Sequence, residues 1–236
     1  MNQRPKPGFV TQQQLNDKRR GFLIRAALTA LVVVIGIVIV VVVINQRSGE
    51  DAPPVTDNVS TEGGIAFGPE DAAVTLSVYE DFQCPACKQF ETLSGETLRD
   101  LADSGEARVI YHPIAILDRV STTQYSTRAA SAAMCVAEYA EDSWLDWQAA
   151  MYQQQPSEGG AGLTNEQMLE LAASAGAESD ELTECVNDVR YGDFIASSTR
   201  KSSDAGVAGT PTVLLNGEPV ENIMPDGLRA AVQEAQ

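Results

Sequence analysis

Histidine and basic residues are scarce in this chain of 236 residues. It has one histidine, His112, and 16 lysines and arginines against 33 aspartates and glutamates. A structural zinc site needs about four nitrogen or sulfur ligands, usually as two close pairs, so a lone histidine leaves such a site to the cysteines. A net charge of −17 offers no basic surface to a nucleic-acid backbone. The composition therefore argues against nucleic acid as a partner.

Cysteine is also scarce, and the four cysteines do not form two close pairs. Two residues separate Cys84 from Cys87, whereas Cys135 and Cys185 each have no other cysteine nearby in the sequence. Neither zinc nor copper is expected, and the chain should need no cofactor. A cysteine hydrolase would require an imidazole base beside its thiolate. Because His112 precedes a proline in a predicted strand, we expect it to be structural rather than catalytic.

The few basic residues gather before a long uncharged run. Ala26 to Ile44 contains 19 residues without a charge. As a helix it would span about 28 Å, close to the ~30 Å hydrocarbon core of a bilayer. Six basic residues precede it and Asp17 is the only acid there. The positive-inside rule then predicts a cytoplasmic tail over residues 1–22 and a single transmembrane anchor over residues 23–44.

A cleaved signal peptide is the alternative to this anchor. Its apolar region would be about 7–15 residues long and would end in a small-x-small cleavage site. The run here is longer and is followed by NQRSGED, so the uncleaved anchor is favoured. The chain after residue 44 has 10 basic and 32 acidic residues, a net charge of −22. We predict that it lies outside the cytoplasm, with residues 45–62 as a flexible linker and residues 63–236 as one domain.

The order of predicted elements in residues 63–236 indicates an α/β fold with a helical insertion. Thr164 to Gln167 has the pattern of a capping box, and Asn216-Gly217 is typical of a hairpin turn. The predicted elements are a strand over 73–82, a helix from 85, a strand over 107–117, a helical insertion over about 119–205 that includes 126–155, 164–176 and 180–203, a β-hairpin over 212–222 and a helix over 225–235.

The Cys84–Cys87 pair has the local physics of a reactive dithiol. Pro85 suits the first position of a helix, which makes Cys84 the N-cap. Unpaired backbone N–H groups and the helix dipole stabilise a thiolate there, and thiol pKa values of about 3.5–7.5 occur in such settings. Cys87, one turn away, would be the shielded resolving thiol. A purely structural disulfide is the alternative.

Cys135 and Cys185 lie on predicted helices of the insertion and would face an oxidising exterior. We expect them to form a structural disulfide, which by chain entropy would contribute roughly 4 kcal/mol for a loop of this length. Two free buried thiols are the alternative. Trp144 and Trp147 either fill the helical core or line a client groove.

Two separate segments carry a family resemblance. Asp81 to Cys87 (DFQCPAC) precedes a helix, and Gly209 to Thr212 (GTPT) precedes a late strand. Together they resemble the thioredoxin superfamily, in particular the DsbA-type thiol-disulfide oxidoreductases and, given the anchor, their membrane-anchored actinobacterial members. The resemblance covers residues 63–236 and implies a thioredoxin-like fold with an α-helical insertion.

The resemblance also implies roles for residues outside the dithiol. Pro211 would be a cis-proline lying against the pair, and the Thr210 backbone would pair with an extended client strand. Glu91 matches a buried acidic position that helps to move protons, although an exposed helical glutamate is equally ordinary. Well-studied members carry histidine where this chain has Ala86, so its disulfide is expected to be less oxidising than theirs.

The implied function is donation of the Cys84–Cys87 disulfide to reduced exported proteins. A quinone-linked membrane protein of the DsbB or VKOR type would reoxidise the pair, and the enzyme would act as a monomer on the outer side of the cell membrane. One alternative is a disulfide reductase or isomerase. Another, of a different class, is a thioredoxin-like client-binding or chaperone module with an inert dithiol.

Overall fold

The computed structural model describes Val59 and residues 63–236. The predicted cytoplasmic tail, transmembrane anchor and nearly all of the linker lie outside these residues. Within the described part of the chain, no helix has both the length and the apolar character needed to cross a membrane. The predicted α/β domain, by contrast, is described throughout.

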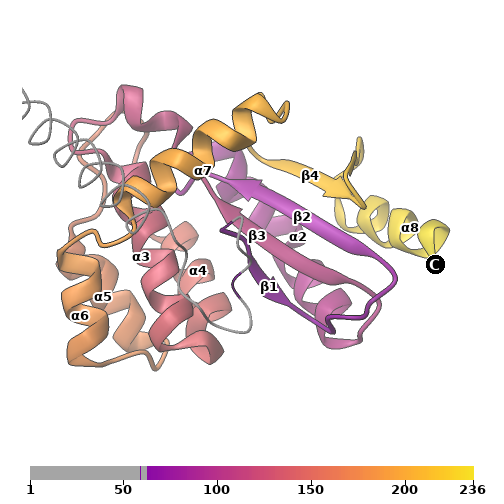
Figure 1. Ribbon diagram of the computed structural model, residues 1–236, viewed down its shortest axis with the longest axis horizontal. Helices are drawn as coiled ribbons and strands as arrows, with labels where there is room; N and C mark the ends of the chain where they lie inside the picture. The colour runs from indigo at the N-terminus through magenta and orange to yellow at the C-terminus, as the bar shows by residue number, and fades with distance from the viewer. Residues whose placement is uncertain (1–58, 60–62) are drawn as a thin grey trace, which may run out of the picture. The chain divides into compact units, whose positions relative to one another are not determined.

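One five-stranded sheet forms the centre of the domain (Figure 1), in the order β1-β3-β2-β4-β5. Helix α2 (Pro85–Asp103) connects β2 to β3, which makes that pair parallel, because such strands need a long crossover. The other neighbouring pairs are antiparallel. The strands are β1 (Ile65–Phe67), β2 (Thr75–Glu80), β3 (Arg108–Pro113), β4 (Thr212–Leu215) and β5 (Glu218–Pro219).

Three details of the sheet differ from the predicted strands. Strand β1 was not predicted, because three residues are too few to show an alternating pattern. Strand β3 is shorter than predicted and ends at Pro113, which lacks the N–H needed to extend the ladder. Strand β5 has only two residues. Pro113 lies in register with Glu80, so both inner strands end at the same edge.

The helical insertion gathers beside the sheet, with α3 to α6 on the left of Figure 1. The predicted helical stretch over 126–155 is two helices, broken at Ala140, whose φ of −157° is not helical. Thr164 caps the next helix with the predicted capping box. The elements are η1 (Ile116–Val120), α3 (Tyr125–Tyr139), η2 (Glu141–Ser143), α4 (Trp144–Gln153), α5 (Asn165–Ser174), α6 (Asp180–Asn187) and α7 (Gly192–Asp204).

Both tryptophans of the insertion fill its core. Trp144 and Trp147 are fully buried, and their indole N–H groups donate to the carbonyl oxygens of Ala133 and Met168. The ring of Phe82, in the loop after β2, packs edge-on against Trp147. Aromatic contacts of this kind add to the burial of their area. The tryptophans therefore join the insertion to the sheet rather than lining a groove.

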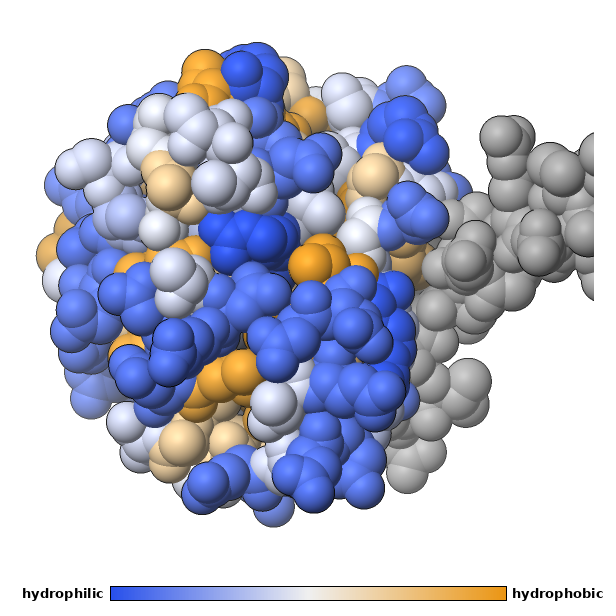
Figure 2. All heavy atoms as spheres, turned by 90° about the vertical axis from the view of Figure 1, so that its left-hand side faces the viewer, coloured by the Kyte–Doolittle hydropathy of each residue, from blue (hydrophilic) through white to orange (hydrophobic). Residues whose placement is uncertain are grey.

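The outer face of the insertion is mostly polar. Figure 2 shows hydrophilic side chains over most of this face, with hydrophobic ones in the hollows between them. A hollow between α5 and α6 is lined by Leu169 and Leu182 together with Glu166 and Glu170. Such a surface is consistent with the acidic composition of the domain.

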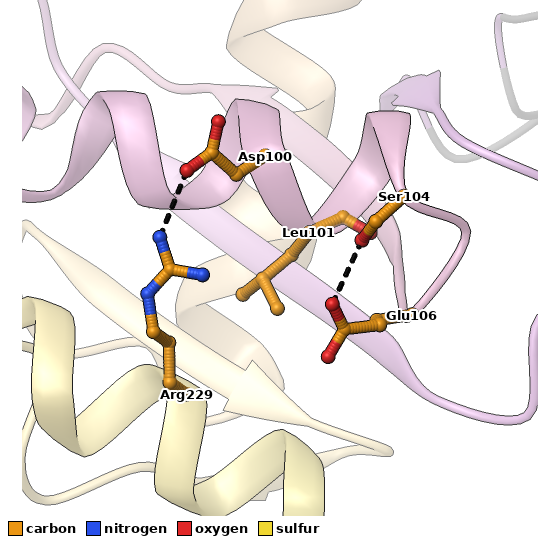
Figure 3. Close-up of polar contacts among 5 residues, drawn as sticks. All are labelled: Asp100, Leu101, Ser104, Glu106 and Arg229. Atoms are coloured by element: carbon orange, nitrogen blue, oxygen red, sulfur yellow. Dashed lines mark hydrogen bonds and ion pairs between the residues drawn. The ribbon is translucent and has the colours of Figure 1, made fainter.

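The C-terminal helix α8 (Pro225–Ala235) packs against α2. Its buried residues are Leu228 and Val232. Figure 3 shows Arg229 paired with Asp100 of α2, at 2.8 Å between Nη2 and Oδ2. This ion pair is half-exposed and contributes little to stability. Burial of the two apolar side chains therefore holds α8 in place and completes this side of the layer.

Candidate active site

The backbone around Cys84 holds this residue at the N-terminus of α2. Cys84 has extended φ and ψ of −76° and 118°, and Pro85 begins the helix. Its N–H donates to the Asp81 carbonyl at 2.8 Å, and its own carbonyl accepts from the N–H groups of Cys87 and Lys88. This is the geometry of an N-cap residue, so the Cys84 side chain lies where the unpaired N–H groups of the first turn point.

The carboxylate of Asp81 stabilises the loop that carries Cys84. Asp81 is fully buried, and its two oxygens accept hydrogen bonds from the N–H groups of Gln83 and Leu117, each at 2.9 Å. Burial raises the pKa of Asp81 to about 6. Because Leu117 belongs to η1, this one side chain ties the loop after β2 to the segment after β3.

Cys84 and Cys87 are free thiols with opposite properties. A hydrogen bond with the Cys87 side chain, assisted by backbone N–H groups of the first turn, lowers the pKa of Cys84 to about 5 in spite of partial burial. Cys84 keeps 8% of its surface exposed, whereas Cys87 is fully buried. Burial, followed by the hydrogen bond to Cys84 and the charge of Glu80, raises the pKa of Cys87 far above its usual range. The site thus pairs a thiolate that keeps a small exposed surface with a fully buried, protonated thiol.

The segment Thr210–Pro211 lies directly against Cys84. The peptide bond between these two residues is cis, and the Cys84 sulfur lies 3.4 Å from the Thr210 carbonyl oxygen, to which the thiol can donate when it is protonated. Strand β4, which follows, pairs with β2, and Thr212 lies in register with Tyr79. The pairing of β4 with β2 therefore places the cis-proline segment beside the dithiol, although the two are far apart in sequence.

Glu80, which is buried, and Glu91, which is half-buried, form a carboxyl pair behind Cys87. Glu91 Oε1 is shielded from solvent, and Glu80 is 4% exposed and accepts from Gln148 Nε2 at 3.0 Å. Burial raises the pKa of Glu91 to about 7, and burial together with the Glu91 charge raises the pKa of Glu80 further. The interaction between the two carboxyl groups raises the pKa of Glu80 and lowers that of Glu91, so the two groups titrate as a coupled pair.

Gly95 makes room for the Glu91 carboxylate. A Cβ atom at Gly95 would lie 2.6 Å from Glu91 Oε2. A glycine in the interior of a helix weakens it, and an alanine here would require the Glu91 carboxylate to shift. Glu91 also lines a hollow of about 330 Å³ together with the exposed Arg99 and the buried Tyr111 and Gln148. Glu91 is thus the member of the carboxyl pair that lines an open hollow.

Sequence reasoning did not find Glu80 or the role of Gly95. The available signal for Glu80 was an acidic residue ending an apolar strand just before the cysteines. His112 has a structural environment, as expected. It is buried on β3, and its ring stacks on that of Tyr79 with 4.4 Å between the ring centroids. Burial lowers its pKa to about 4. No group of three or more potential metal-ligating side chains occurs among residues 63–236 and Val59.

Cys135 and Cys185 form a disulfide that joins α3 to α6, with Cα atoms 5.9 Å apart. The bond lies wholly within the helical insertion and both cysteines are fully buried. It leaves Cys84 and Cys87 as the free cysteines of the described residues. The dithiol at the head of α2 can therefore change its redox state independently of the second pair.

A thioredoxin-like sheet, a dithiol at the start of α2 and a cis-proline beside it define a class: the thiol-disulfide oxidoreductases. Residues 60–234 match the sequence model of the family described as Thioredoxin. The chain therefore belongs to the thioredoxin family, and within it to the DsbA-type enzymes with a helical insertion.

Individual relatives support this placement. The oxidised DsbA of Mycobacterium tuberculosis is 33% identical with a TM-score of 0.64, over 73% of this chain and 92% of that chain. The reduced disulfide bond oxidoreductase DsbG of the same organism is 31% identical with a TM-score of 0.62, over 80% and 91%. The disulfide bond formation protein D of Bacillus subtilis (strain 168) is 24% identical over 176 residues, 74% of this chain and 76% of that protein.

Proposed function

We propose that this protein oxidises dithiols of exported proteins by donating its Cys84–Cys87 disulfide. A client thiolate attacks the Cys84 sulfur, the bond to Cys87 breaks, and Cys87 leaves with the electron pair and takes up a proton. A second client thiolate then attacks the client sulfur of the mixed disulfide and releases the Cys84 thiolate. The client loses two electrons and the enzyme gains them.

The position of Cys84 at the N-terminus of α2, where Cys87 and first-turn N–H groups lower its pKa, carries this direction. A thiolate stabilised at a pKa of about 5 is a good leaving group in the second step. It also favours the reduced enzyme over the oxidised one, and a stable reduced form makes a disulfide oxidising. With Ala86 between Pro85 and Cys87, we infer a potential between those of thioredoxin and DsbA, about −270 and −120 mV.

The carboxyl pair would supply the proton that Cys87 needs. Glu80 interacts electrostatically with Cys87, and its titration is coupled to that of Glu91. Because the pKa of Cys87 lies far above its usual range, its thiolate must be protonated as it leaves. Glu80 would give that proton and recover it from Glu91, which reaches solvent through the hollow beside Arg99.

The remaining roles complete the proposed cycle. The Thr210 backbone, presented by Pro211, would pair with an extended client segment. The predicted anchor over residues 23–44 would hold the domain at the outer side of the cell membrane. There a quinone-linked protein of the DsbB or VKOR type would accept the two electrons and restore the disulfide. The enzyme would act as a monomer, and the Cys135–Cys185 bond would serve stability.

Trapping of clients tests this function. In cells, Cys87→Ala should accumulate disulfide-linked client proteins on Cys84, because the resolving thiol is gone. The matched control, Cys84→Ser combined with Cys87→Ala, should trap none. Equilibration of the purified wild type with glutathione should give a potential above that of thioredoxin.

The same experiments separate the competing functions. A potential at or below about −270 mV would favour a reductase. Exported proteins whose disulfides form normally in cells carrying Cys84→Ser would favour a chaperone module with an inert dithiol.

A further inference from the structure

A side chain of the helical insertion holds the backbone of the redox loop. Gln155 Nε2 donates to the carbonyl oxygens of Phe82 and Cys84, each at 2.9 Å. Gln155 follows the end of α4 and lies 71 residues after Cys84 in sequence. A second contact lies beside it, because Lys88 Nζ donates to the Gln153 carbonyl at 3.2 Å. The end of α4 is therefore bonded to both sides of the Cys84–Pro85 peptide.

Chemistry fixes the orientation of the Gln155 amide. An amide nitrogen carries two N–H donors, which matches two carbonyl acceptors. The flipped amide would place its own oxygen against both carbonyl oxygens and repel them. Gln155 is half-buried, and Phe82 and Cys84, whose carbonyl groups it binds, are buried at 3% and 8% exposure, so water does not readily replace this donor.

The Cys84 carbonyl is the acceptor that defines the start of α2. It also accepts from the N–H groups of Cys87 and Lys88. Its direction therefore decides how the N–H groups of Ala86 and Cys87 lie relative to the Cys84 sulfur. Those groups contribute to the low pKa of Cys84, so a donor that fixes the carbonyl also fixes the environment of the sulfur.

We propose that Gln155 is a positioning residue through which the helical insertion sets the reactivity of Cys84. Its two hydrogen bonds hold the Cys84 peptide so that the sulfur stays aligned with the first-turn N–H groups of α2. The inference rests on the proposed function only in taking Cys84 as the reactive thiol. In this proposal the helical insertion not only packs beside the sheet but also positions the Cys84 peptide.

The pH dependence of Cys84 ionisation in the purified, reduced, full-length protein tests this role. Thiolate absorbance and the rate of Cys84 alkylation are measured across pH, with Cys84→Ser as the blank. Gln155→Ala loses both hydrogen bonds. It should raise the midpoint by about half a unit to one unit, the size of one ordinary hydrogen bond, because only the bond to the Cys84 carbonyl acts on the start of α2. Gln155→Glu should raise it further, because a carboxylate cannot donate and adds negative charge beside the carbonyl groups.

Gln154→Glu is the matched control. Gln154 is exposed at the end of α4, so this variant adds the same charge one residue earlier without removing the contact. Its midpoint should move less than that of Gln155→Glu. Thermal unfolding of each variant shows whether it is folded. If Gln155→Glu does not fold, the midpoint of Gln155→Ala alone tests the role of Gln155.

Two results would overturn the proposal. One is an unchanged midpoint in Gln155→Ala, even with reduced thermal stability, which would leave Gln155 a merely structural role. The other is an equal shift of the midpoint in Gln154→Glu and Gln155→Glu, which would show that the added negative charge, and not the lost hydrogen bonds, causes the shift. Both readouts use the isolated reduced protein without a client, so a failure of client oxidation by the wild type is a separate outcome.

Discussion

The sulfur of Cys84 lies 3.4 Å from the carbonyl oxygen of Thr210, 126 residues later in the chain. The antiparallel pairing of β2 with β4 brings them together, because Cys84 follows one strand and Thr210 precedes the other. The backbone proposed to pair with a client thus lies against the sulfur that a client thiol would attack. Binding of an extended segment there would place its sulfur within reach of Cys84.

The lowered pKa of Cys84 predicts a pH-dependent contribution to stability. A thiol near pKa 8.5 in the unfolded chain and about 5 in the folded chain stabilises the fold fully above pH 8.5 and loses this as pH falls through 5. Reduced wild type should therefore gain up to about 1 kcal/mol per pH unit over reduced Cys84→Ser between these values. Urea unfolding at several pH values measures it, and parallel curves would contradict it.

The carboxyl pair predicts the opposite dependence on pH. Glu91 has its pKa raised to about 7 by burial, so the wild type loses stability as pH rises from about 4 through 7. Glu91→Gln removes one ionisation and should be more stable than wild type by about 1–2 kcal/mol at pH 8, with the difference shrinking toward pH 4.

Denaturant unfolding across pH checks this prediction, and Glu96→Gln is its control. Glu96 lies on the same helix, is exposed and loses the same charge. Its substitution should leave the slope of stability against pH close to that of the wild type. An identical slope in Glu91→Gln and Glu96→Gln would show that the buried pair carries no raised pKa.

Gly95 should be a helix glycine at which alanine gives no gain. Alanine usually stabilises a helix interior by about 1 kcal/mol over glycine, but its Cβ would lie 2.6 Å from Glu91 Oε2. We expect Gly95→Ala to be neutral or destabilising in the wild type. In the Glu91→Ala background it should recover the gain of about 1 kcal/mol. A double-mutant cycle of unfolding free energies measures this coupling; equal effects in both backgrounds would rule it out.

Loss of the Cys135–Cys185 bond should affect stability and leave the redox site unchanged. Replacing both cysteines with alanine should lower the free energy of unfolding by about 2–4 kcal/mol, given a separation of 50 residues. The pH midpoint of Cys84 alkylation should not move, because the bond lies within the insertion between α3 and α6. A shifted midpoint would mean that this bond also positions the dithiol.

Ala86→His should make the disulfide more oxidising. Ala86 is exposed between the two cysteines, and an imidazolium there would stabilise the nearby thiolate. A further stabilisation of about 1.4 kcal/mol corresponds to about 30 mV in a two-electron potential. Equilibration with glutathione measures the change, with Ala86→Gln as a neutral control of similar size. An equal rise in both variants would show that charge is not the cause.

Much of the fold could be predicted because its signals are local. The capping box at Thr164, the proline that starts α2 and the Asn-Gly turn before β5 each act over a few residues. Strand β1 could not be predicted, since its three residues owe their conformation to pairing with β3. The break at Ala140 was likewise hidden within a continuous helix-favouring stretch.

By itself, the sequence determined the two cysteines, their spacing and the helix start that makes Cys84 an N-cap, because helix termini follow from neighbouring residues. Only the tertiary structure brought Thr210 and Gln155 to this helix start and buried Glu80 beside Cys87. Burial of the carboxyl pair and the direction of a carbonyl depend on side chains and strands far away in the chain. No pattern along the sequence records such contacts, because desolvation and hydrogen bonding act through space.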